Sequence, residues 1–144
     1  DYTDIKSIDS YEHLKKGLEL AVGSATDMLK TNFSRYDYFY IHFKETDIPG
    51  HDNKPREKVK LIECIDKEFF GFLRLFFEEH HARLLVTAEH TTSCRVKSHT
   101  ANPVPVLFFD SSHLKNYDGR FTEIDGLKGR RFEGRALLKK TLFV

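Results

Sequence analysis

Residues 36–52 read YDYFYIHFKETDIPGHD, and this stretch decides the fold class. Its first nine residues are almost continuously apolar or aromatic, a pattern typical of a strand buried on both faces of a parallel sheet. Pro49 and Gly50 then disfavour a helix, so we expect a tight loop that presents Asp47 and His51. The sequence therefore predicts a strand followed by a loop that carries an acid and a histidine.

Helical and strand patterns alternate on both sides of this stretch. A capping box, Asp9 with Glu12, precedes a helical stripe of apolar residues. Downstream, Asp52 or Asn53 is expected to cap a second helix that has Pro55 in its first turn. The expected elements are helices over residues 10–31, 55–81 and 134–142, and strands over residues 36–44, 84–88 and 104–109.

The order strand, loop, long helix, strand is a βαβ unit, and such crossovers join parallel strands. We therefore expect an α/β fold with a mostly parallel sheet flanked by helices. Parallel strands end at one edge of their sheet, and open α/β sheets bind ligands just outside that edge. Two loops would meet there, and they carry Asp47, His51, Glu89, His90 and His99.

Carboxylate and imidazole groups are common ligands of Zn²⁺ and Mn²⁺. A single Asp-x-x-x-His spacing is a weak signal, because a histidine after a strand is more often a solvated loop residue or a helix cap. The convergence of two loops makes a metal site an equal alternative to this structural interpretation. For the remaining histidines we expect structural roles: His80 and His81 at the end of their helix, His13 and His113 exposed, and His42 hydrogen-bonded in the core.

Composition disfavours several classes of protein. Lys plus Arg total 23 against 22 Asp plus Glu, so no charge excess favours a nucleic acid or a membrane surface as partner. Cys64 and Cys94 form no disulfide framework, which favours a reduced, intracellular setting. Without an 18-residue apolar run or a basic-then-apolar leader, we expect neither a spanning helix nor a signal peptide. The chain opens with Asp1, so processing and origin in a longer protein are both open.

Three groups of motifs occur in a fixed order. HFKETDIPGHD, residues 42–52, matches the pattern His-x-Lys-x-Thr-Asp-x-x-Gly-His-Asp. VTAEHTTSCRVKSHTANPVPVLFF, residues 86–109, follows the pattern Thr-Ala-Asp-His-x-Thr with Glu89 in place of the aspartate, then Lys-x-His, then a Pro-Val-Pro strand. An Arg-Phe-x-Glu motif at residues 120–123 and Gly134 follow. Over residues 35–135 the chain thus resembles the C-terminal half of the cofactor-independent phosphoglycerate mutases, particularly the archaeal type, in the alkaline phosphatase superfamily.

This resemblance implies an alkaline-phosphatase-like fold with two divalent metal ions, usually Mn²⁺, or Zn²⁺, Co²⁺ or Mg²⁺. One ion would be bound by Asp47, His51 and His99. The second would be bound by Glu89 and His90, with Glu89 standing where the family has aspartate. Lys44 and Lys97 would add positive charge near the phosphate, or be solvated.

The implied activity is the interconversion of 3-phosphoglycerate and 2-phosphoglycerate in glycolysis and gluconeogenesis, through a phosphoserine. The serine and a further metal-binding aspartate are expected upstream, so residues 1–144 would be the C-terminal segment of the metal-binding domain, without the N-terminal segment and the substrate domain. We therefore expect a cytoplasmic isomerase as the full-length protein and an inactive isolated chain. Two alternatives stay open: another metal-dependent phosphatase or phosphomutase of the superfamily, and a non-catalytic metal-binding fragment.

Overall fold

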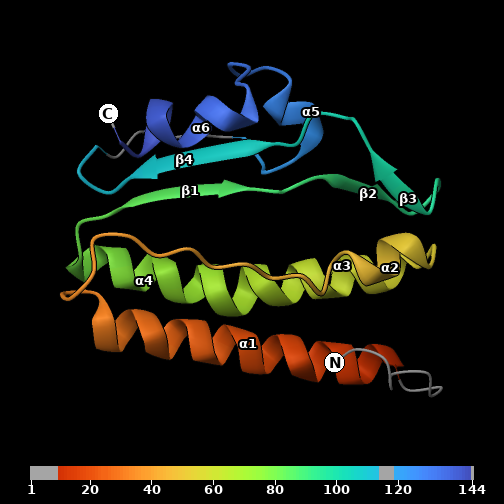
Figure 1. The fold of residues 1–144 in the computed structure, drawn as a ribbon. Coiled ribbons are helices and arrows are strands. Elements are labelled where there is room, and N and C mark those ends of the chain that lie inside the picture. The colour runs from red at the N-terminus through yellow and green to blue at the C-terminus, as the bar shows by residue number, and fades with distance from the viewer. Residues whose placement is uncertain (1–9, 114–118, 144) are drawn as a thin grey trace. The chain divides into compact units, whose positions relative to one another are not determined.

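The computed structural model describes residues 10–113 and 119–143 (Figure 1). The expected capping residue Asp9 lies outside the described residues. Helices and strands follow one another as α1 (Ser10–Asn32), α2 (Ile48–His51), α3 (Pro55–Cys64), the π-helical stretch η1 (Ile65–Phe70), α4 (Gly71–Glu79), β1 (Arg83–Thr87), β2 (Thr91–Ser93), β3 (Ser98–Thr100), β4 (Val106–Asp110), α5 (Glu123–Gly126) and α6 (Gly134–Thr141).

The described residues belong to two compact units. The first takes in the chain up to Arg74 together with Thr92–Ser98, and the second takes in Leu75–Thr91 and the chain from His99 onward. None of the described helices is both long and apolar enough to cross a membrane.

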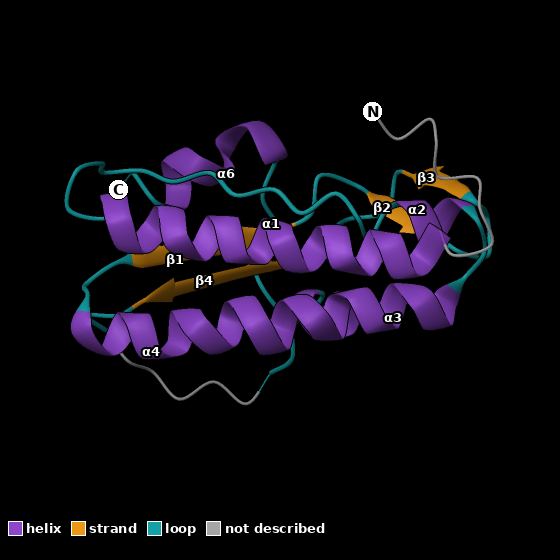
Figure 2. Ribbon diagram, turned by 90° about the horizontal axis from the view of Figure 1, so that it is seen from below, coloured by secondary structure: helices purple, strands orange, loops and turns teal. Residues whose placement is uncertain are grey.

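In the first unit, α1 packs against α3 and η1, and both ribbon views show α1 and α3 side by side (Figures 1 and 2). The apolar stripe predicted over residues 10–31 is the buried face of α1. Its buried members recur at helical spacing: Leu14, Leu18, Val22 and Leu29. The helix predicted from this periodicity is therefore confirmed.

The predicted second helix is continuous from Pro55 to Glu79, as α3, η1 and α4. Pro55 stands in its first turn, as expected. The predicted caps are wrong, because Lys54 is the N-cap residue and offers no side-chain hydrogen bond. Asp52 instead accepts a hydrogen bond from Tyr11, at 2.6 Å, and Asn53 takes a left-handed conformation (φ 53°) in the turn before the helix.

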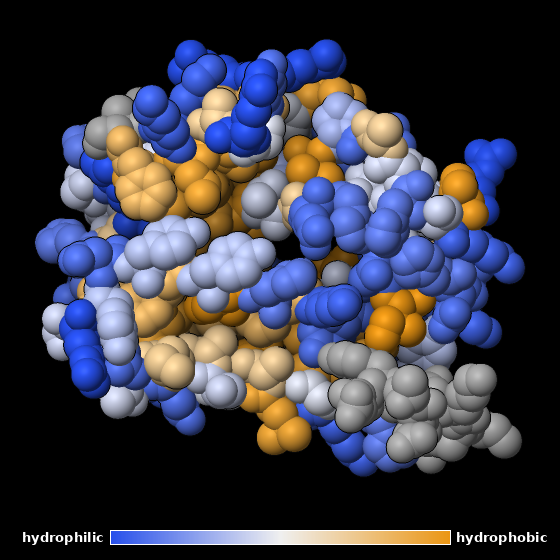
Figure 3. Space-filling model, in the orientation of Figure 1, coloured by the Kyte–Doolittle hydropathy of each residue, from blue (hydrophilic) through white to orange (hydrophobic). Residues whose placement is uncertain are grey.

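Residues 36–44, for which the sequence predicts a buried strand, are an irregular segment. Phe39 and Phe43 are half-buried, against Phe33 and Phe69 respectively, whereas Tyr40 is 76% exposed. His42 is also exposed, which corrects its assignment to the core. Figure 3 shows apolar and pale side chains lying open among hydrophilic ones on the face that it draws. A strand needs paired neighbours to be stable, so the apolar run alone does not secure one.

In the second unit, β1 and β4 confirm the other two predicted strands to within two residues. They pair antiparallel, in register from Arg83 opposite Asp110 to Thr87 opposite Val106. Their connection holds the β2–β3 hairpin and no crossover helix, and so it returns the chain antiparallel. The described strands form two two-stranded sheets, and the expected parallel sheet is not among them. Helix α6 confirms the predicted last helix.

Candidate metal centre

Asp47 and His51 lie at the two ends of α2, a single helical turn. Asp47 is its N-cap residue and His51 its last residue, and Oδ2 of Asp47 is 3.5 Å from Nε2 of His51. The prediction of a non-helical loop was wrong, because Pro49 stands in the first turn, where no backbone N–H is needed. The four-residue spacing therefore does place both side chains on one face.

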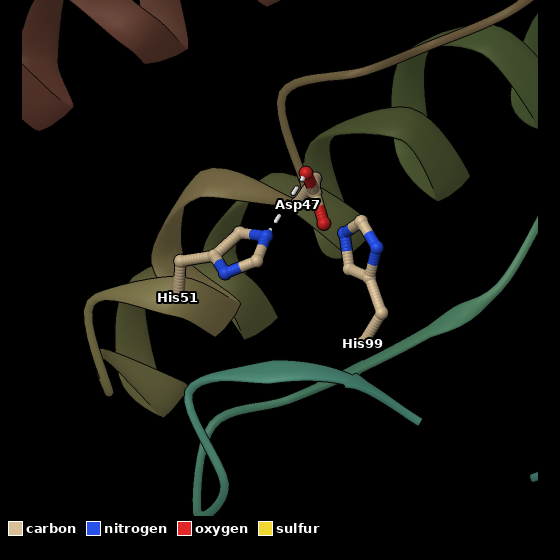
Figure 4. Close-up of side chains that lie close together, drawn as sticks. All are labelled: Asp47, His51 and His99. Carbon is tan, nitrogen blue, oxygen red and sulfur yellow. Dashed lines mark ion pairs between the residues drawn. The ribbon is translucent and has the colours of Figure 1, made fainter. Parts of the chain in front are cut away.

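The hairpin brings a third group to this pair. His99 lies in β3, directly after Ser98, and one ligand atom from each of Asp47, His51 and His99 lies within 4.8 Å of the other two. Figure 4 shows the two imidazole rings on either side of the Asp47 carboxylate. Asp47 is half-buried and both histidines are exposed. One carboxylate oxygen and two imidazole nitrogens make a donor set that suits Zn²⁺ or Mn²⁺.

A backbone carbonyl sets the orientation of His51. Nδ1 of His51 is 3.2 Å from the carbonyl oxygen of Lys97. A carbonyl oxygen only accepts, so this contact is a hydrogen bond when Nδ1 carries a proton, and Nε2 is the ring nitrogen that faces Asp47. Histidines that bind metals commonly donate their other N–H to a carbonyl or carboxylate in this way. The Lys97 carbonyl thus holds the Nδ1 side of the ring and leaves Nε2 on the side of the Asp47 carboxylate.

The other residues expected at the site lie differently. Glu89 is exposed, and the ring of His90 stacks on that of His99, with centroids 3.7 Å apart. Within residues 10–113 and 119–143, no cluster of three or more potential ligands includes Glu89 or His90. The side chains of Lys44 and Lys97 are exposed. The backbone carbonyl of Lys44 accepts a hydrogen bond from the Asp47 N–H at 3.1 Å, and the carbonyl of Lys97 contacts the His51 ring.

Three residues near the centre were missed by sequence reasoning. Tyr11 of α1 donates its hydroxyl to Asp52, and its burial together with this bond raises the pKa of Tyr11. Thr92 of β2 donates to Asp47, and Lys58 of α3 donates to the Thr92 carbonyl at 2.7 Å. Thr92 is the last residue of the Thr-Ala-Asp-His-x-Thr pattern, which could have drawn attention to it. Nothing in the local pattern singles out Tyr11 or Lys58.

Residues 3–132 match the model of the Metalloenzyme superfamily, and the chain belongs to that superfamily. It is similar to a Pyrococcus abyssi protein named 2,3-bisphosphoglycerate-independent phosphoglycerate mutase, with 38% identity over 94 residues, 65% of this chain and 23% of that protein. It is also similar to a Thermosipho melanesiensis protein named a probable enzyme of the same kind, with 33% identity over 128 residues, 89% of this chain and 30% of that protein.

A solved structure supports the same relationship. The PH0037 protein from Pyrococcus horikoshii superposes with a TM-score of 0.70 and 32% sequence identity, over 85% of this chain and 36% of that one. The family expected from the motifs is therefore confirmed. The chain spans about a quarter to a third of the length of these curated relatives, which are 23% and 30% covered.

Proposed function

We propose that this chain is the metal-binding, C-terminal part of a 2,3-bisphosphoglycerate-independent phosphoglycerate mutase, a cytoplasmic isomerase of glycolysis and gluconeogenesis. The observation that carries the proposal is the meeting of Asp47, His51 and His99 in a chain of the Metalloenzyme superfamily. The names of its relatives supply the kind of enzyme, a phosphoglycerate mutase, and the proposed reaction is the interconversion of 3-phosphoglycerate and 2-phosphoglycerate.

Asp47, His51 and His99 would hold one divalent ion, with Mn²⁺ first and Zn²⁺, Co²⁺ or Mg²⁺ as alternatives. Glu89 and His90 would contribute to a second ion, whose remaining ligands come from outside residues 1–144. Such ions supply positive charge that stabilises the transferring phosphoryl group. This chain's own part would be to hold the ligands in place, for example through the Lys97 carbonyl at the His51 ring.

Phosphoglycerate would meet the positive charges of Lys44 and Lys97, whose backbone carbonyls adjoin the ligands and whose side chains are exposed. The nucleophilic serine would lie in an N-terminal segment of the longer protein, which would also contain the substrate domain. There, residues 36–44 would be a strand of the mostly parallel sheet of an alkaline-phosphatase-like fold. Their apolar composition and exposure support this placement.

Calorimetric titration of Mn²⁺ and of Zn²⁺ into the metal-free 144-residue chain tests the metal site. We expect saturable binding by the unmodified chain. The double substitution His51→Ala with His99→Ala should weaken binding by at least about 100-fold, because losing direct ligands costs more than losing their supporting hydrogen bonds. The matched control is His13→Ala, an exposed histidine of α1 outside the cluster, which should leave the affinity unchanged.

Unchanged affinity in the double variant would refute the site. The reaction has a separate test, because a chain without the nucleophilic serine cannot form a phosphoenzyme. We expect no interconversion of the phosphoglycerates by the pure 144-residue chain, measured in a coupled assay with added Mn²⁺. Turnover by this chain alone would refute the proposed division of the enzyme.

A further inference from the structure

Thr92 connects the β2–β3 hairpin to the helices of the first unit. The residue is only 5% exposed. Its hydroxyl donates a hydrogen bond to Oδ1 of Asp47, and its carbonyl accepts one from Nζ of Lys58 at 2.7 Å. Thr92 is therefore held by its backbone while its side chain contacts a predicted metal ligand.

The absence of a side chain at Gly50 allows this close contact. A Cβ at Gly50 would lie 2.8 Å from Cγ2 of Thr92 and 2.8 Å from its carbonyl oxygen. Cys94, two residues further along the hairpin, donates its thiol to the carbonyl of Pro49 at 3.7 Å. Residues 92–94 thus lie directly against α2, and these contacts restrict movement of the Thr92 hydroxyl away from Asp47.

The two oxygens of the Asp47 carboxylate consequently have different neighbours. Oδ1 accepts from Thr92, whereas Oδ2 lies 3.5 Å from Nε2 of His51. A carboxylate with one oxygen in a hydrogen bond is restrained in rotation, and the other oxygen then has a defined direction. Here that direction is towards Nε2 of His51, the neighbouring proposed ligand.

We propose that Thr92 is a positioning residue for the metal centre: its hydroxyl holds Asp47 so that Oδ2 faces the divalent cation. This inference rests on the proposed function, because it assumes that Asp47 binds a metal. It adds a specific role for a hydroxyl group that is not itself a ligand. A purely structural Thr92 would only fill space and satisfy hydrogen bonds within the unit.

Two matched comparisons separate these roles. Thr92→Val keeps the shape of the side chain and removes the hydroxyl. Thr92→Ser and Thr92→Ala both lack the methyl group near Gly50, and they differ from each other only in the hydroxyl. Mn²⁺ affinity is measured by calorimetry, thermal unfolding is measured on each metal-free protein, and the visible absorption of bound Co²⁺ reports the ligand geometry.

We expect Thr92→Val to bind Mn²⁺ about 10- to 100-fold more weakly than the unmodified chain, the range typical for groups that orient metal ligands. Thr92→Ser should stay within about threefold of the unmodified chain, whereas Thr92→Ala should lose as much affinity as Thr92→Val. Thr92→Ser should nevertheless unfold at a lower temperature, because it loses a buried methyl group. The Co²⁺ spectrum should change in the valine and alanine variants and not in the serine variant.

Affinity that follows stability instead of the hydroxyl would overturn the inference. Equal Mn²⁺ affinities in the Thr92→Ser and Thr92→Ala variants would also overturn the inference. This comparison tests the role of the hydroxyl even if Thr92→Val fails to fold. When the unmodified chain binds Mn²⁺ and Thr92→Val binds it equally well, only the role of Thr92 is refuted. Absence of binding in the unmodified chain would refute the proposed metal site and this inference together.

Discussion

The orientation of His51 shows what a single residue gains from the fold. The sequence predicted His51 as a metal ligand from the convergence of two loops and from the family resemblance. It could not identify the Lys97 carbonyl as its partner, because that carbonyl is 46 residues away. The same is true of Thr92, which is 45 residues from Asp47. Candidate ligands can thus be predicted from sequence motifs, whereas the orientation of their side chains depends on contacts between distant segments.

Gly50 gives a prediction at the scale of one carbon atom. A side chain there would meet Thr92 at 2.8 Å, and backbone is among the atoms met, so a rotamer change does not relieve the clash. We expect Gly50→Ala to lower the free energy of unfolding by about 1–3 kcal/mol, the usual cost of overpacking. Urea denaturation of the metal-free protein measures this change.

The control adds the same atom in an open place. Gly23 lies in α1, and among the described residues no atom beyond its own helical backbone lies within 4 Å of where its Cβ would be. Gly23→Ala should raise the free energy of unfolding by about 0.5–1 kcal/mol, because alanine loses less backbone entropy in a helix. A Gly50→Ala protein as stable as the unmodified chain would show that α2 and Thr92 are not in close contact.

At the scale of elements, periodicity predicted the helices and composition predicted two strands. The apolar stripe of α1 and the position of Pro55 were enough to predict α1 and the start of α3, since both features are local. The short helix α2 was missed because proline generally breaks helices, although a first turn tolerates it and Pro49 stands in one. The direction of strand pairing was also missed. It depends on the course of the connection from β1 to β4, which residue patterns do not determine.

Asp110 links the ends of the β1–β4 pair. Its carboxylate accepts hydrogen bonds from the hydroxyl and backbone N–H of Ser112, and from Nε of Arg83 at 3.1 Å. The Ser112 hydroxyl is the largest of the causes that lower the pKa of Asp110 from 3.8 to about 2. A lowered folded-state pKa means that the ionised carboxylate stabilises the fold above the unfolded pKa, and that this stabilisation is lost as pH falls towards 2.

We therefore expect Asp110→Asn to be less stable than the unmodified chain at pH 7, by a difference that shrinks as the pH falls from about 4 to about 2. Chemical denaturation across this pH range measures the difference. Asp27→Asn, at an exposed carboxylate of α1, controls for the general loss of one negative charge. A difference of the same size at both ends of the range would rule out the ionised carboxylate as its source.

At the scale of the whole molecule, residues 36–44 show the limit of reading a segment by its composition. Tyr36, Tyr38, Tyr40 and His42 are all exposed, while Phe39 and Phe43 are half-buried, which is nearly the alternation of a strand with one covered face. The pattern predicted a strand, yet strand formation needs pairing partners. The described residues provide none in the structure, since they form only the β1–β4 and β2–β3 sheets.

Hydrogen exchange tests whether these partners lie in the longer protein that we propose. In the 144-residue chain, the amides of residues 37–43 are outside any helix or strand, so they should exchange much faster than those of β1, which pair with β4. In the longer protein the same amides should become protected, because a central strand of a sheet is hydrogen-bonded on both sides. Mass spectrometry of peptides covering both segments measures both rates, and β1 serves as the internal reference. Slow exchange of residues 37–43 in the short chain would mean that they are already paired, and fast exchange in both proteins would refute their place in the proposed parallel sheet.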